Sequence, residues 1–184
     1  MNEHQSHARE AMPPSLIEEE KSYYEYTVIK SFYGDQTAKR SGLPLMNHID
    51  EGLAFLKVVS KAAPNTKKAW CIHPIVQAGL WPWRKIDVAW PVLDIANAYS
   101  RYANAYLSPR HVQSLYEIAC PLSVDEPEHQ MLVADKVQNR KDYEQYQEPN
   151  GRLDNYFNKW LKRLGVKEEY PDWRMWLLSI QGTL

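Results

Sequence analysis

The chain has 184 residues, which is enough for one domain with a full hydrophobic core. Charged residues make up 24%, aromatic residues 12% and the AVILMFWYC set 44%, a balance that excludes disordered and fibrous proteins. Lys and Arg number 22 against 23 for Asp and Glu, so the formal net charge of −1 draws no polyanion to the whole molecule. We therefore expect one globular domain with no nucleic-acid partner, in which any phosphate-binding site must be local.

The first residues, 1–14, are polar and end in two prolines, so we expect a flexible leader followed by one domain over residues 15–184. The leader lacks the apolar stretch of a signal peptide, and no later run approaches the roughly 18 apolar residues that span a bilayer. Cys71 and Cys120 are too few for a disulfide scaffold and are expected to be reduced core thiols. These features predict a cytoplasmic protein without a membrane partner.

Helical periodicity begins in residues 16–33, where apolar and aromatic positions recur at helical spacing until Gly34 ends the helix. A second helix is expected over about residues 44–62, because a proline suits its first turn. A third helix begins at about Thr66, and Pro74 must bend or end it.

Residues 79–91 hold three tryptophans and two prolines and are expected to be irregular. The remaining expected elements are helices over about residues 91–107, 108–119, 125–146 and 152–164, the last ended by Gly165, and a packed segment over 170–178. No convincing β alternation and no internal repeat is present. The predicted fold class is therefore all-α, a single-domain helical bundle.

Three segments carry polar residues at fixed offsets: Arg40-Ser-Gly-Leu-Pro-Leu-Met-Asn-His48, Cys71-Ile-His73-Pro-Ile-Val-Gln77 and Met131-Leu-Val-Ala-Asp135-Lys-Val-Gln-Asn139-Arg140. In this order they resemble the HD superfamily, specifically its (p)ppGpp hydrolase branch of RelA/SpoT type. In that branch one helix opens with a basic residue, Ser-Gly-x-Pro and a His. A later helix carries His-Asp, and a third carries Leu-Ala-Asp-(Arg/Lys)-x-x-Asn. The resemblance covers about residues 35–145 and implies an HD-like helical bundle.

The resemblance also implies a role for individual residues. The metal-binding histidines of the family fall on His48 and His73, and its last metal-binding aspartate falls on Asp135. In the family the metal-bound water is the nucleophile that attacks phosphorus. The Asn that lines the nucleotide site in the family falls on Asn139, and the basic residues ahead of Ser-Gly fall on Lys39 and Arg40, which are candidates for binding phosphate.

The chain departs from the family at Pro74, where the family has the Asp of its name, and at Gln77 and Ala78, where the hydrolases have an acidic pair. Two histidines and one carboxylate can still hold a divalent cation with open positions for water. The resemblance therefore implies a divalent metal cofactor whose identity, among Mn, Fe, Zn, Ni and Co, is left open.

The missing carboxylate could come from elsewhere, with Asp50, Glu51 and Asp94 as candidates. Glu51 is favoured because a residue three positions after His48 shares its helical face. Glu51 and Gln77 are thus the candidate catalytic residues. Each ligand also has a plainer role open to it, because a lone His is often a hydrogen-bonded structural residue. A buried carboxylate such as Asp135 could instead pair with Lys136 or Arg140.

Basic and amide side chains could converge on a phosphorylated ligand, because guanidinium and ammonium groups suit phosphate oxygens. The further candidates for substrate binding are Lys136 and Arg140 on one predicted helix and Asn97 and Arg101 on another. The last two share a helical face, which could line a pocket or form an exposed polar surface.

The favoured reading is a metal-dependent phosphohydrolase acting on a small nucleotide, either (p)ppGpp-like or a nucleoside mono- or triphosphate. One alternative is a catalytically inactive HD fold that binds a nucleotide or a protein, because the characteristic aspartate is absent. A third is an HD-type iron oxygenase, because the surviving ligand set also suits iron. Whether the chain forms a homo-oligomer is left open.

Overall fold

The computed structural model describes residues 16–39, 41–80, 87–107 and 126–165, and every regular element in these ranges is a helix. The helices are α1 (Glu18–Lys21), α2 (Tyr24–Tyr33), α3 (Leu45–Val58), α4 (Pro64–Gln77), α5 (Trp90–Leu107), α6 (Pro127–Tyr146) and α7 (Gly151–Arg163). The all-α bundle that the periodicity predicts is confirmed.

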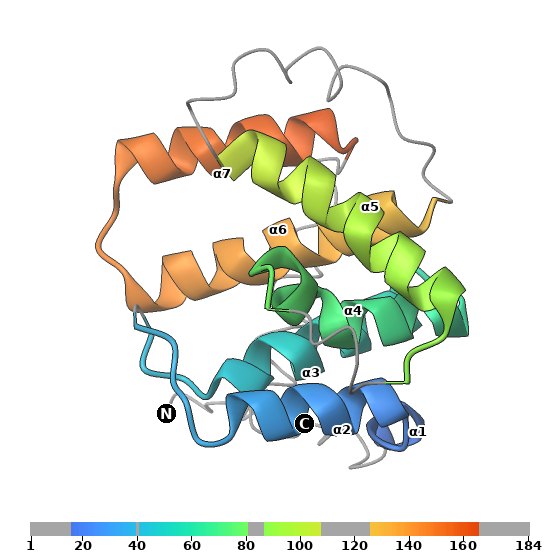
Figure 1. Cartoon of the computed structure of the whole chain (residues 1–184). Coiled ribbons are helices and arrows are strands. Elements are labelled where there is room, and N and C mark those ends of the chain that lie inside the picture. The colour runs from blue at the N-terminus through green and yellow to red at the C-terminus, as the bar shows by residue number, and fades with distance from the viewer. Residues whose placement is uncertain (1–15, 40, 81–86, 108–125, 166–184) are drawn as a thin grey trace, which may run out of the picture.

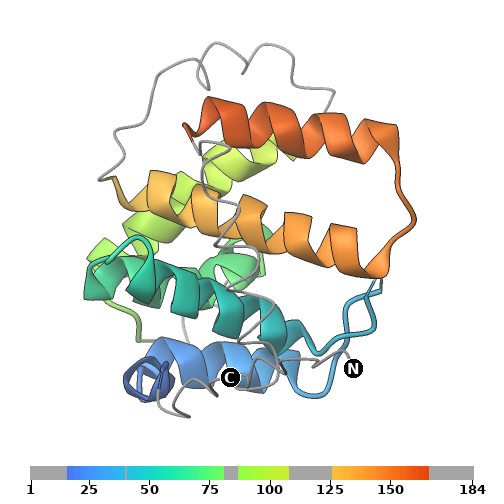
Figure 2. The same ribbon diagram turned by 180° about the vertical axis from the view of Figure 1, so that it is seen from behind.

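Helices α2, α3, α6 and α7 lie one above another when the molecule is seen from behind (Figure 2). Helices α4 and α5 pack most extensively on each other and lie across the opposite side of this row (Figure 1). Further contacts join α3 to α6, α5 to α6, and α4 to both α2 and α3. Because α3, α4 and α6 meet in the interior, the helices that carry the three motifs are brought together.

Local signals at the helix ends act as the sequence predicts. Gly34 follows α2 with φ 51° and Gly165 follows α7 with φ 67°, a region that favours glycine over residues with a side chain. Asn150 caps α7, where its side chain accepts hydrogen bonds from the backbone of Arg152 at 3.0 Å and Leu153 at 3.4 Å.

Three boundaries differ from the prediction. The helix expected over residues 16–33 is divided into α1 and α2, because Tyr23 is extended with φ −65° and ψ 140°. Helix α3 ends at Val58 rather than near residue 62, and α4 begins at Pro64 rather than Thr66. Pro74 does not end α4, which continues to Gln77. A proline removes one backbone hydrogen bond, and here the carbonyl that loses it finds a side-chain partner, as described below.

Trp70 is the largest fully buried side chain in the described core, and it lies against α3. Its indole Nε1 donates to the Ile49 carbonyl at 3.0 Å. A Cβ at Gly52 would come within 2.0 Å of the Trp70 ring, so only glycine permits this approach of α3 and α4. The packing of Trp70 therefore fixes the two helices that carry the histidine motifs.

Several predicted features lie outside the described residues. They are the leader over 1–14, Arg40, the helix over 108–119, Cys120, most of the tryptophan segment and the packed segment over 170–178. Cys71, which is described, is buried as expected. No helix in the described ranges is both long and apolar enough to cross a bilayer.

Candidate functional site

Two imidazole rings from different helices face each other at the centre of the bundle. His48 lies in the first turn of α3 and His73 lies in α4, and their Nε2 atoms are 3.4 Å apart. The ring centroid of Trp70 is 4.9 Å from that of His48 and 4.4 Å from that of His73. His73 is 2% exposed, and its burial together with the neighbouring His48 lowers its pKa to about 3. His73 is therefore neutral at pH 7 and can offer a nitrogen lone pair.

The carboxylate of Asp135 approaches this pair from α6. Its Oδ1 is 3.9 Å from His48 Nε2 and accepts a hydrogen bond from Asn139 Nδ2 at 2.7 Å. Its Oδ2 forms a short ion pair with the buried Lys136. Burial alone would raise the pKa of Asp135, yet the neighbouring Lys136 ammonium holds it below its ordinary value. Asp135 is thus an ionised carboxylate beside two imidazoles.

The outer nitrogen of each histidine is also engaged. His48 Nδ1 is 2.8 Å from Gln138 Oε1, and His73 Nδ1 is 2.6 Å from the carbonyl oxygen of Trp70. Metal-binding histidines in proteins almost always donate their second nitrogen to a carbonyl, carboxylate or water in this way. The surroundings of both rings therefore match those of imidazole ligands.

Among the described residues, no three His, Cys, Asp or Glu side chains form a group that could hold a metal ion. The carboxylate nearest the histidine pair is that of Asp135, and its two oxygens are held by Lys136 and Asn139. Two bonds of about 2.1 Å at a tetrahedral angle place their donor atoms about 3.4 Å apart, so the histidine pair has the spacing of two zinc-type ligands. The histidine pair therefore has the spacing of two ligands, whereas the Asp135 carboxylate is engaged by Lys136 and Asn139.

Glu51, the favoured replacement ligand, takes a different place from the one expected. It has no exposed surface, and its carboxylate oxygens accept from Lys141 Nζ at 2.5 and 2.7 Å. Gln138 lies between it and His48 in the hydrogen-bond network. Glu51 therefore lies behind His48, joined to it through Gln138, and is paired with a lysine that the sequence pattern did not assign to it.

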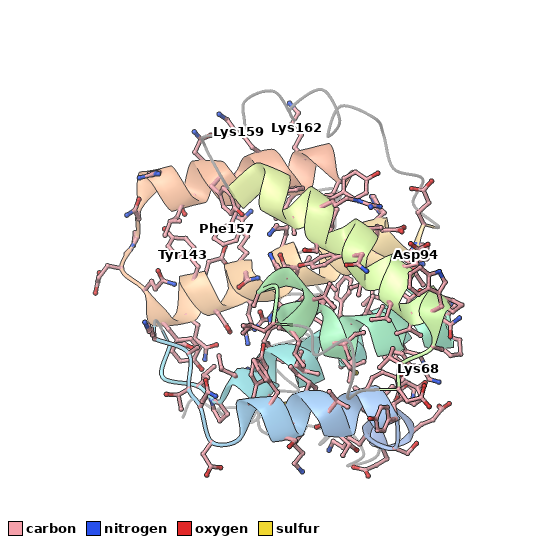
Figure 3. All side chains as sticks on the ribbon, viewed as in Figure 1. Lys68, Asp94, Tyr143, Phe157, Lys159 and Lys162 are labelled. Atoms are coloured by element: carbon pink, nitrogen blue, oxygen red, sulfur yellow. The ribbon has the colours of Figure 1, made fainter. Side chains whose placement is uncertain are left out.

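The other two carboxylates considered for the missing ligand also lie elsewhere. Asp50 accepts a hydrogen bond from the Tyr26 hydroxyl at 2.8 Å, and burial raises its pKa to about 6. Asp94 is exposed on the outer side of α5 (Figure 3). Neither contacts the histidine pair.

A cavity of about 980 Å³ adjoins Asp135 and opens between the loop before α3 and helices α6 and α7. Its described lining includes Lys39, Gln77, Tyr99, Lys136, Asn139 and Arg152. Tyr143 and Phe157 also contribute to the lining, and Figure 3 shows these two rings close together between α6 and α7. Their centroids are 5.6 Å apart in a stacked arrangement. The cavity thus combines cations, amides and aromatic surface beside the Asp135 carboxylate.

The structure brings some predicted binding residues to this cavity and not others. Lys39, Gln77, Lys136 and Asn139 line it, whereas Arg40 lies outside the described residues. Asn97 and Arg101 are not among its described lining residues, and Arg101 is exposed. Arg140 instead donates to Glu144 at 2.7 Å and to Asn158 of α7 at 2.8 Å, so it joins two helices.

Two buried residues of the site are missing from the sequence prediction. Gln138 is 1% exposed and Lys141 is 2% exposed, although both types usually lie at the surface. Gln138 follows Asp135 by three positions, which places it on the same side of α6, and this spacing was the available signal. Lys141 gives no such signal, because only the packing of α3 against α6 brings Glu51 to it.

No family model, curated protein or solved structure matches this chain. The likeness to HD phosphohydrolases therefore rests on the three sequence motifs.

Proposed function

We propose that the chain is a metal-dependent phosphohydrolase that acts on a small nucleotide, with His48, His73 and Asp135 as ligands of a divalent cation. The observation that carries the proposal is the pair of Nε2 atoms 3.4 Å apart, with an ionised carboxylate beside them. The likeness of the three motifs to the (p)ppGpp hydrolase branch supports the nucleotide. A bound divalent cation supplies a water of lowered pKa and polarises a phosphoryl oxygen.

The residues of the cavity suit a phosphorylated ligand. Lys39 is exposed at the rim, while Lys136 is buried and 5.1 Å from the Trp160 ring centroid. Asp135 would hold the cation through a carboxylate oxygen, and the Lys136 ammonium, which also lines the cavity, could then bind a phosphate oxygen. Asn139 can then direct its amide to the same group or keep Asp135 in place.

A binding module without catalysis is the second candidate, and one observation favours it. Lys136 already neutralises Asp135, and the side chain of Lys136 is only 4% exposed. In such a module the ammonium would remain on the carboxylate and a nucleotide would bind without a metal. Metal binding separates the two functions.

The test is elemental analysis of full-length protein purified without chelators or a metal affinity column, followed by titration with Mn²⁺, Fe²⁺, Zn²⁺, Ni²⁺ and Co²⁺. We expect about one ion per chain, lost in His48→Ala and in Asp135→Asn. His129→Gln is the matched control, because His129 lies on α6 and contacts the Leu164 carbonyl at 3.0 Å, away from the pair.

The loaded protein is then offered nucleoside mono- and triphosphates and (p)ppGpp, with release of phosphate and pyrophosphate as the readout. Turnover that requires the metal supports the hydrolase. A protein that binds none of the five ions rejects it, and nucleotide binding by that metal-free protein would establish the binding module.

A further inference from the structure

The side-chain amide of Gln138 can adopt only one orientation. Its Nε2 is 3.1 Å from Glu51 Oε2 and 2.8 Å from Asp142 Oδ2, and ionised carboxylates accept hydrogen bonds but cannot donate them. The NH₂ group must therefore face the two acids. Its oxygen is left facing His48 Nδ1 at 2.8 Å. Since an amide oxygen only accepts, His48 must carry a proton on Nδ1, and the neutral ring then has its lone pair on Nε2.

The acids that orient Gln138 are held in turn by a lysine. Lys141 Nζ lies 2.5 and 2.7 Å from the two oxygens of Glu51 and 2.8 Å from Asp142 Oδ1. Asn47 Nδ2 donates to Glu51 Oε1 at 3.0 Å. Glu51 therefore has four hydrogen bonds in the interior, where an unpaired polar group would be costly.

A different hydrogen bond fixes the tautomer of His73. Pro74 has no backbone N–H, so the Trp70 carbonyl four residues earlier has no helical donor. His73 Nδ1 is 2.6 Å from that carbonyl and takes the place of the missing donor. A carbonyl oxygen only accepts, so His73 also carries its proton on Nδ1 and its lone pair on Nε2.

When both rings are neutral, these contacts leave the two Nε2 lone pairs 3.4 Å apart. We propose that Gln138, oriented by Glu51 and Lys141, and Pro74 are positioning residues that hold His48 and His73 in the tautomers able to bind one cation between them. Pro74, which replaces the aspartate expected from the sequence likeness, thereby supports the neighbouring ligand. The identity of the cation rests on the proposed function, but the tautomers do not.

The direct test is ¹⁵N NMR of the full chain with labelled histidine, freed of metal, at about pH 8, where ordinary imidazoles are neutral. Both His48 and His73 should show a protonated Nδ1 and an unprotonated Nε2. A proton on Nε2 of either residue overturns the proposal. Signals are assigned from His48→Ala and His73→Ala.

Gln138→Met removes the acceptor for His48 while keeping the length of the side chain. We expect His48 to shift toward the Nε2–H tautomer, and the Kd for Zn²⁺ to rise about 10–100-fold, the usual effect of losing a hydrogen-bond partner of a metal-binding His. Gln130→Met is the matched control, because Gln130 lies on the same helix and its amide donates to the Ser60 carbonyl at 3.4 Å, away from His48. An unchanged His48 tautomer in Gln138→Met contradicts the proposal.

Pro74→Ala should weaken metal binding without destabilising the helix, a combination that a merely structural role of Pro74 would not give. The new N–H competes with His73 for the Trp70 carbonyl, so the helix should be at least as stable while the Kd for Zn²⁺ rises about 10-fold. Equal affinity in Pro74→Ala and wild type would remove Pro74 from the proposal. If the wild-type tautomers are as expected but no metal binds, the proposed function fails while the positioning of the histidines stands.

Discussion

Two glutamates with no exposed surface, Glu20 and Glu51, are both neutralised by lysines, yet they serve different parts of the molecule. Glu20 lies on α1 and accepts from Lys57 at 2.8 Å and from Lys67 at 2.6 Å, which ties α1 to α3 and α4. Glu51 accepts from Lys141 and from Gln138, which continues to His48. A buried ion pair is therefore evidence of function only when its hydrogen bonds lead to a residue of the site.

The lysines of the two clusters also differ in their exposure to solvent. The side chain of Lys57 is 30% exposed, whereas that of Lys141 is 1% exposed. A lysine near the surface can regain water when its partner is removed, but an enclosed lysine cannot. The two clusters should therefore respond differently to the same substitution.

Glu51→Ala should have the largest effect, because it leaves Lys141 buried without its main partner. Breaking a buried pair from one side costs about 3–5 kcal/mol of unfolding free energy. Chemical denaturation measures this loss, and the Kd for Zn²⁺ should rise in the same variant as Gln138 loses one of its two acids. A loss below about 1 kcal/mol would show that the cluster is open to water.

Glu20→Ala should cost about 2 kcal/mol, less than Glu51→Ala, because one of its two lysine partners, Lys57, can extend into solvent and only Lys67 is left buried. Its Kd for Zn²⁺ should equal that of the wild type, since no described contact joins Glu20 to the histidines. A changed affinity would break the comparison by showing that both clusters reach the site.

The same variant makes a prediction about pH. Burial raises the pKa of Glu20, but the hydrogen bonds from Lys57 and Lys67 outweigh it and leave the pKa below its ordinary value of 4.5. A carboxyl with a lowered folded pKa stabilises the fold above its ordinary pKa, and this contribution is lost as the pH falls through the folded value. Denaturation curves of wild type and Glu20→Ala should therefore converge at low pH and separate toward neutrality.

Glu51→Gln combined with Lys141→Met separates stability from positioning. Replacing both members of a buried pair by neutral groups of similar size is often nearly neutral, so we expect a loss of about 1 kcal/mol. Gln138 then faces another amide in place of an acid, and its orientation is less strictly fixed. The Kd for Zn²⁺ should rise about 10-fold although the fold is retained. Unchanged affinity would show that Asp142 alone orients Gln138.

The contrast between the clusters explains what could be predicted from the sequence. Helix type and the ends at Gly34 and Gly165 follow from local chemistry, and both were predicted correctly. The break at Tyr23 was not, because no local signal marks it, and α1 is tied through Glu20 to residues far along the chain. The boundary therefore depends on tertiary contacts.

The residues of the site also fall into those that the sequence predicts and those that depend on tertiary contacts. Motif spacing brought His48, His73 and Asp135 into consideration, and the fold places them together. The pairing of Glu51 with Lys141 could not be predicted, because a charged residue at a helical position looks the same whether it is solvated or buried. Only the contact of α3 with α6 decides between those two cases.

Arg140→Ala should have the smallest effect on stability, because it removes the most exposed of the ion pairs compared here. Arg140 pairs with Glu144 four residues later at 2.7 Å, where the Glu144 side chain is 37% exposed. An exposed pair of this kind stabilises a helix by at most about 0.5 kcal/mol, although the bond to Asn158 adds a link to α7. The thermal midpoint and the Kd for Zn²⁺ should both stay close to wild type. A loss as large as that of Glu20→Ala would mean that the link between α6 and α7, rather than burial of charge, sets the stability of this half of the bundle.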